Sequence, residues 1–172
     1  MTDGPGTATR QAPLSGSFTV ERDLAASPGR VFAAYADTRL RRRWFGIPGN
    51  PADARHELDF RPGGHEISRG RFAPSGESGT EELIEYRSVF WDIVPDSRIV
   101  FGYELVLDEV RRWVSLVTVE LAGRPDGRTR LSYTEQYVLL AYAGDGAQDR
   151  AHLKGSIPLQ LNGLAAALSA NA

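Results

Sequence analysis

The C-terminal segment over residues 148–168 carries a single apolar stripe, and this feature limits the fold more than any other in the sequence. The stripe repeats every three or four residues, which is the period of an α-helix. It consists of Leu153, Ile157, Leu161, Leu164 and Leu168. Pro158 cannot donate a hydrogen bond to the Lys154 carbonyl, so we expect a kink there. A long helix with one apolar side needs a surface to cover, and a curved sheet provides one.

The sequence before this helix is typical of strands joined in hairpins. Turn sequences such as Pro62-Gly63-Gly64 and Pro95-Asp96 separate runs that alternate between apolar and polar residues. Two short helices, over residues 28–37 and 38–46, follow the first strand. Successive hairpins predict an antiparallel meander. The expected strands cover residues 17–24, 55–60, 65–72, 82–94, 98–107, 113–121 and 129–139.

Composition excludes several classes of protein. The formal net charge of -2 gives no electrostatic case for a nucleic-acid partner. The absence of cysteine excludes disulfides, thiol catalysis and zinc sites that need thiolates. No apolar run has the length of a signal peptide or a membrane span, so we expect no membrane insertion and a cytoplasmic location.

The domain organisation follows from length and from the N-terminal composition. A chain of 172 residues is normally one domain. The first fifteen residues are small, polar and rich in Gly, Pro and Thr. We therefore expect a disordered leader over residues 1–15 and a single domain over residues 16–172.

The sequence resembles the START-like superfamily, also called the SRPBCC or helix-grip superfamily. Within it, the chain is most similar to the family named after the activator of the 90-kDa heat-shock protein ATPase. The family's usual Gly-Trp pair in the last helix is missing, since that part reads HLKGSIPLQLNGL. The segments that carry the resemblance are FTVERDLAASPGRVFAAYAD, RRRWFG, HELDFRPGGHEISRG, DIVPDSRIVFGYEL, VSLVTVEL and GRTRLSYTEQ.

The resemblance implies an α+β helix-grip fold. Such a fold has a curved antiparallel sheet of six to seven strands, two short helices after the first strand, and a long C-terminal helix packed on the concave face. It also implies a cavity between sheet and helix that accepts lipids, polyketides or other apolar small molecules. Alternation along the strands supports an enclosed face independently, because Tyr133, Glu135 and Tyr137 share one side. A filled core with tyrosine tips at its rim is the alternative that the residues leave open.

The candidate ligand-binding residues come from these faces, from the helix stripe and from the end of the second short helix. Trp44 and Phe45 are expected either in the core or as a gate over the cavity mouth. The full set is Trp44, Phe45, Glu66, Tyr86, Phe101, Tyr103, Tyr133, Glu135, Tyr137, Ile157 and Leu161.

Glu135 and Glu66 are the two carboxylates that the alternation turns inward. Burial of an unpaired carboxylate is costly, so each is expected either to be paired or to have a raised pKa. The functional interpretation is a ligand contact or a general base. The structural interpretation is a glutamate paired with an arginine, or a strand end in solvent. Glu135 is the candidate general base, and no residue is assigned a catalytic role.

Other motifs carry less information. His56, His65 and His152 lack metal-ligand spacing, so we expect no metal, and no motif predicts a cofactor. The basic run Arg39, Arg41, Arg42 and Arg43 is expected to form a solvated helix face.

Three classes of function fit the sequence. The favoured one is carriage or sensing of an apolar small molecule. The second is an enzyme on the same fold, such as a cyclase, dehydratase or hydrolase. The third is a cochaperone-like module that stimulates an ATPase through its surface. The sequence leaves a homodimer and a chaperone partner open.

Overall fold

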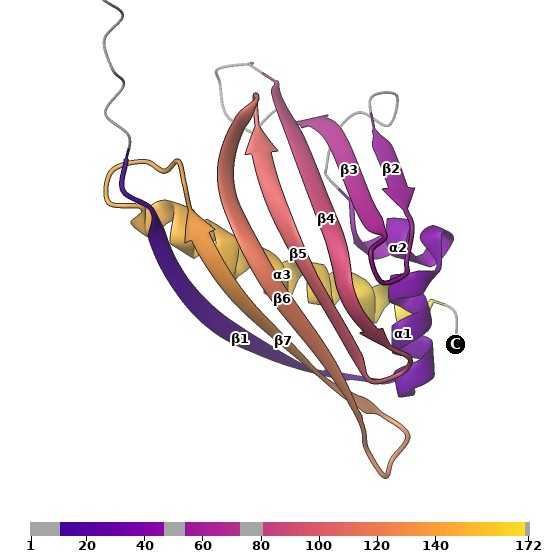
Figure 1. Cartoon of the computed structure of the whole chain (residues 1–172). Helices are drawn as coiled ribbons and strands as arrows, with labels where there is room; N and C mark the ends of the chain where they lie inside the picture. Colours follow the sequence, from indigo (N-terminus) through magenta and orange to yellow (C-terminus); the bar gives the residue numbers. More distant parts are fainter. Residues whose placement is uncertain (1–10, 47–53, 73–80, 171–172) are drawn as a thin grey trace, which may run out of the picture.

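The computed structural model describes residues 11–46, 54–72 and 81–170, and these residues form one curved sheet with three helices on its concave side (Figure 1). The strands are β1 (Leu14–Leu24), β2 (Arg55–Leu58), β3 (His65–Phe72), β4 (Glu82–Val94), β5 (Arg98–Leu107), β6 (Val110–Gly123) and β7 (Thr129–Leu139). The helices are α1 (Pro28–Ala36), α2 (Thr38–Trp44) and α3 (Ala147–Ser169). All seven strands pair antiparallel in the order β1-β7-β6-β5-β4-β3-β2. The predicted helix-grip α+β fold is confirmed.

Two boundaries differ from the prediction by three residues, and the others by two or fewer. β1 begins at Leu14, so the last two residues assigned to the leader belong to the sheet, and residues 1–10 lie outside the described residues. β6 begins at Val110 because Asp108 and Glu109 adopt positive φ angles of 44° and 67°, which close a two-residue hairpin turn. A sequence of Asp and Glu gives a weaker turn signal than Asn-Gly, and the prediction therefore began this strand too late.

The α3 stripe is buried as predicted. Leu153, Ile157, Leu161, Leu164 and Leu168 are at most 8% exposed, with Leu168 the most accessible. Pro158 does not end the helix. It lies on the exposed side, as does Lys154, so water can reach the carbonyl that loses its partner. None of the described helices is long and apolar enough to cross a membrane.

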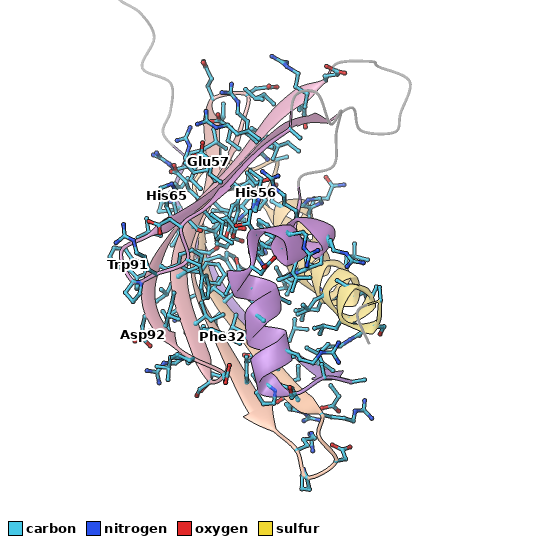
Figure 2. All side chains as sticks on the ribbon, turned by 90° about the vertical axis from the view of Figure 1, so that its right-hand side faces the viewer. Phe32, His56, Glu57, His65, Trp91 and Asp92 are labelled. Atoms are coloured by element: carbon cyan, nitrogen blue, oxygen red, sulfur yellow. The ribbon has the colours of Figure 1, made fainter. Side chains whose placement is uncertain are left out.

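α3 makes its main approaches to α2, α1 and β1. Gly163 allows the closest of these, because a Cβ there would lie 3.3 Å from the carbonyl oxygen of Trp44. Between α3 and the central strands β4, β5 and β6 the interior is hollow. The outer face of the sheet carries Trp91, which is 64% exposed, while Phe32 of α1 lies on the inner side (Figure 2).

Candidate ligand-binding cavity

A cavity of about 530 Å³ lies between the concave face of the sheet and α3, with α2 at one end. Eight of the predicted ligand-binding residues lie in its wall, from α2, the central strands and α3. They are Trp44, Phe45, Tyr86, Phe101, Tyr103, Tyr133, Ile157 and Leu161. The structure therefore has a hollow interior instead of the filled core that the residues alone left open.

Three predicted residues are close to the cavity but are not part of its wall. Glu66 and Glu135 are fully buried behind the wall residues. Tyr137 packs on Phe18 with ring centroids 6.2 Å apart. Its hydroxyl points at Gly16, where a Cβ would lie 2.5 Å from the Tyr137 oxygen.

The wall also contains residues that the sequence did not single out as site residues. Alternation in β4, β5 and β6 would have found Ile84, Leu105, Leu107 and Trp113, which share faces with predicted residues. Ser156 and Gln160 lie beside Ile157 and Leu161 on α3. The same alternation places Glu82 on the face of Ile84. The remaining additions depend on tertiary packing and carry no sequence signal: Tyr35, Arg41, Gly46, Arg112, Asp149 and His152.

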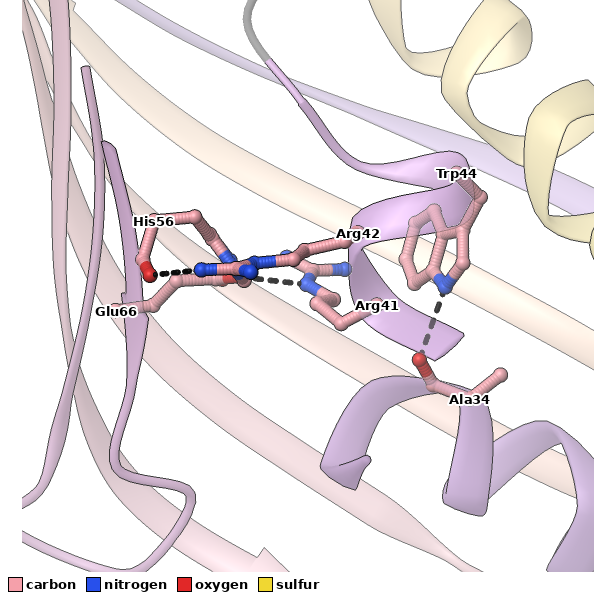
Figure 3. A network of polar contacts seen from close by, with 6 residues as sticks. All are labelled: Ala34, Arg41, Arg42, Trp44, His56 and Glu66. Atoms are coloured by element: carbon pink, nitrogen blue, oxygen red, sulfur yellow. Dashed lines mark hydrogen bonds and ion pairs between the residues drawn. The ribbon is translucent and has the colours of Figure 1, made fainter. Parts of the chain in front are cut away.

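Arg41 and Glu66 form a buried ion pair at the α2 end of the cavity (Figure 3). Arg41 Nε and Nη2 donate to the two Glu66 oxygens at 2.8 Å each. The α2 segment was predicted to expose its basic residues. This prediction is wrong for Arg41, which is 4% exposed, and holds for Arg39, Arg42 and Arg43. Arg41 is buried because of tertiary packing: Glu66 lies on β3 inside the fold, and a buried carboxylate needs a paired cation.

His56 completes this cluster from β2. Its Nε2 lies 2.8 Å from Glu66 Oε1, while Arg42 Nε donates to its Nδ1 at 3.2 Å. Because Nδ1 accepts a hydrogen bond, the ring proton sits on Nε2 and is donated to Glu66. Burial alone would raise the pKa of Glu66, but the Arg41 charge and the hydrogen bonds from His56 and Arg41 outweigh it and lower the pKa below its usual value. Glu66 is therefore an ionised structural residue, the paired-arginine interpretation of the sequence.

Aromatic rings hold Arg41 in place and continue along the cavity. The Arg41 guanidinium carbon lies 3.8 Å from the Phe45 ring centroid and 4.3 Å from that of Trp44. Phe45 stands edge-on to Tyr86 at 4.9 Å, and Tyr86 lies 5.0 Å from Tyr103. These cation–π and ring contacts form one connected wall, which presents flat apolar faces to the interior.

Glu135 lies at the centre of a second polar cluster, behind the middle of the wall. The Tyr103 hydroxyl donates to its Oε1 at 2.6 Å and the Tyr133 hydroxyl to its Oε2 at 3.2 Å. Trp113 Nε1 in turn donates to the Tyr103 oxygen at 3.2 Å. Burial raises the pKa of Glu135, and the hydroxyl groups around it oppose this only in part. Unlike Glu66, this carboxyl has no cation beside it among the described residues.

A row of polar residues crosses the sheet beneath the cavity. Glu66, Ser88, Tyr103, Ser115 and Tyr137 are successive cross-strand partners from β3 to β7. Ser88 and Ser115 are buried, with 3% and 7% of their surface exposed. The cavity thus has an aromatic wall with a row of polar residues behind it, of which Tyr103 alone belongs to the lining among the described residues.

Charged groups also lie near the N-terminal end of α3. Arg112 Nη2 contacts Asp149 Oδ1 at 2.6 Å, and Glu82 and His152 lie in the same part of the wall. The Arg112 side chain is 28% exposed, so this end of the cavity is nearer to solvent. Among the described residues, no group of three or more His, Asp or Glu could hold a metal ion.

Comparison with known proteins agrees with this fold. An uncharacterised protein from Rhizobium leguminosarum shares 35% identity over 92% of this chain and 97% of its own, with a TM-score of 0.76. The Mll3558 protein from Rhizobium loti shares 38% identity over 91% of this chain and 99% of its own, with a TM-score of 0.73. DynU16, from the dynemicin biosynthetic locus, shares 16% identity over 89% of this chain and 47% of its own, with a TM-score of 0.58, which shows a common fold alone. No curated protein matches the sequence.

The family assignment covers most of the chain. Residues 25–169 match the family described as "Activator of Hsp90 ATPase homolog 1-like protein". This range includes α1, α2, six of the seven strands and all of α3. The chain therefore belongs to the Activator of Hsp90 ATPase homolog 1-like family, within the helix-grip superfamily.

Proposed function

We propose that the protein carries or senses an apolar small molecule in the cavity between the sheet and α3. The observation that supports this proposal is the presence of the cavity. A volume of about 530 Å³ falls in the range of small-molecule sites, and its wall combines aromatic rings with a few polar groups. A core evolved only for stability would be packed to leave no such void, because each void costs stability.

A saturation experiment with a neutral apolar fluorophore tests the proposal. N-phenyl-1-naphthylamine should bind native protein, purified without denaturation, at one saturable site per chain. Flat polycyclic compounds should displace it. Trp44 and Trp113 line the cavity, so their emission should be quenched in parallel with binding. Native mass spectrometry of the same preparation should reveal any co-purifying molecule. Absence of saturable binding would instead support the cochaperone-like class, which needs only the surface.

An enzyme is the second candidate, and one contact favours it. Tyr103 lies in the cavity wall and is bonded to the buried Glu135 at 2.6 Å, so a proton could pass between a ligand and the carboxyl through the phenol. In a carrier, Glu135→Gln should change affinity by no more than about 0.5–1.5 kcal/mol, because it reaches the ligand only through its hydrogen bond with Tyr103. In an enzyme, this substitution should abolish turnover while binding survives.

A further inference from the structure

The charges around the cavity bear on which ligand it takes, if the proposed function holds. Two cations lie in the wall, Arg41 and Arg112, and each is paired with a carboxylate at 2.8 Å or less. Glu82 and Glu135 add two further carboxyl groups, one in the wall and one behind it. Whatever the protonation of Glu135, it adds no positive charge. Among the described residues, the lining therefore holds no arginine without a carboxylate partner that could receive a ligand carboxylate or phosphate.

Hydrogen-bond donors are nevertheless available at the α2 end. Arg41 uses Nε and Nη2 for Glu66, whereas its Nη1 makes no hydrogen bond to a described residue. The ring stacking fixes the plane of this guanidinium, so the remaining N–H groups have a fixed direction. Tyr35 adds a phenol in the same part of the wall. The centroid of its ring lies 5.2 Å from the Arg41 guanidinium carbon. Burial raises the pKa of Tyr35, so its hydroxyl keeps its proton and stays a donor.

We propose that the cavity binds a neutral, ring-containing molecule whose carbonyl oxygen accepts hydrogen bonds from Arg41 Nη1 and the Tyr35 hydroxyl. The aromatic side chains of Phe45, Tyr86 and Tyr103 pack against the ring system of the ligand. A neutral acceptor uses the donors without adding a charge to a region whose own charges already cancel. An anion of the same shape would have to be desolvated beside Glu66 with no cation of its own.

A series of fluorene derivatives tests the proposal with one ring skeleton. Fluorenone is a neutral ketone, fluorene has no acceptor, fluorene-9-carboxylate is an anion and 9-aminofluorene is a cation. Their dissociation constants can be measured by displacement of N-phenyl-1-naphthylamine. Fluorenone should bind at least about tenfold more tightly than the carboxylate and the amine, since a charged group buried without a partner costs more than one decade of affinity.

Variants then identify the donors. Tyr35→Phe removes only a hydroxyl and should weaken fluorenone binding by about two- to tenfold, the worth of one hydrogen bond, while fluorene affinity stays unchanged. Tyr137→Phe is the matched control, because Tyr137 is also buried but lies outside the cavity wall. It should leave the affinity of both compounds unchanged. Arg41→Lys tests the second donor, provided that its circular dichroism spectrum shows the native fold.

The outcomes separate this inference from the proposed function. If fluorene and the carboxylate bind as tightly as fluorenone, the cavity is a ligand site but the inferred ligand class is wrong. Tightest binding of the carboxylate or the amine, or a Tyr35→Phe variant that binds fluorenone like the wild type, would also overturn it. If N-phenyl-1-naphthylamine binds but no member of the series displaces it, the inferred ligand class is wrong and the proposed function stands. If the fluorophore does not bind either, both are contradicted.

Discussion

Two buried glutamates, on neighbouring regions of one sheet face, have pKa values shifted in opposite directions. Glu66 is surrounded by donors from Arg41 and His56, whereas Glu135 is surrounded by phenols. A carboxyl with a cation is held ionised, and one without a cation is pushed toward its neutral form. The two residues should therefore give stability opposite dependences on pH.

Glu66 should stabilise the fold at neutral pH and lose this effect in acid. Its pKa in the folded protein lies below the usual value of 4.5, so the folded state binds its proton less tightly than the unfolded state. The stabilisation is complete above about pH 4.5 and disappears as the pH falls through the lower folded value. Urea unfolding of Glu66→Gln should accordingly show a weaker loss of stability in acid than the wild type. The exposed Glu21→Gln is the control and should unfold like the wild type; equal acid sensitivity of both variants would contradict the assignment.

Glu135→Gln should behave in the opposite way. The pKa of Glu135 is raised, so the folded state binds its proton more tightly, and stability falls as the pH rises from about 4.5 through the folded value. Glutamine keeps the shape and cannot ionise. The variant should match the wild type below about pH 4.5, and its free energy of unfolding should rise relative to that of the wild type as the pH increases. A variant that is less stable than the wild type at neutral pH would show that the ionised carboxylate stabilises the fold.

At the scale of the helices, α3 combines a buried stripe with an exposed face. Leu164 is fully buried, whereas Leu159 is 71% exposed on the same helix. Leu164→Ala should lower the free energy of unfolding by about 2–5 kcal/mol, because it removes contacts and leaves a void. Leu159→Ala, the matched control with the same change in composition, should shift it by no more than about 0.5 kcal/mol. Similar effects in both variants, measured as urea midpoints, would contradict the burial of this stripe.

Most of this architecture could be predicted at the level of elements, and less of it at the level of the site. Alternation in β7 correctly predicted that Tyr133 and Glu135 face inward, because the two-residue period of a strand is a local property of the backbone. The environment of Arg41 could not be predicted in the same way. Its partner Glu66 is 25 residues away, and only the packing of α2 against the β2 end of the sheet brings the two together. A basic helix looks solvated until its tertiary partner is known.

For the whole molecule, the proposed function requires that ligand binding depend on the empty volume of the cavity and not only on the presence of the folded sheet. Leu105 lies in the cavity wall, and replacement with tryptophan should occupy part of the hollow. Leu105→Trp should therefore keep or raise the thermal midpoint, because a void is filled, while the affinity for N-phenyl-1-naphthylamine falls by at least about tenfold. Leu116→Trp makes the same change on the outer face, where Leu116 is 41% exposed, and should bind the probe like the wild type. If the folded Leu105→Trp variant retains full binding, the probe site lies outside the cavity; if both variants lose binding, the effect belongs to the sheet as a whole.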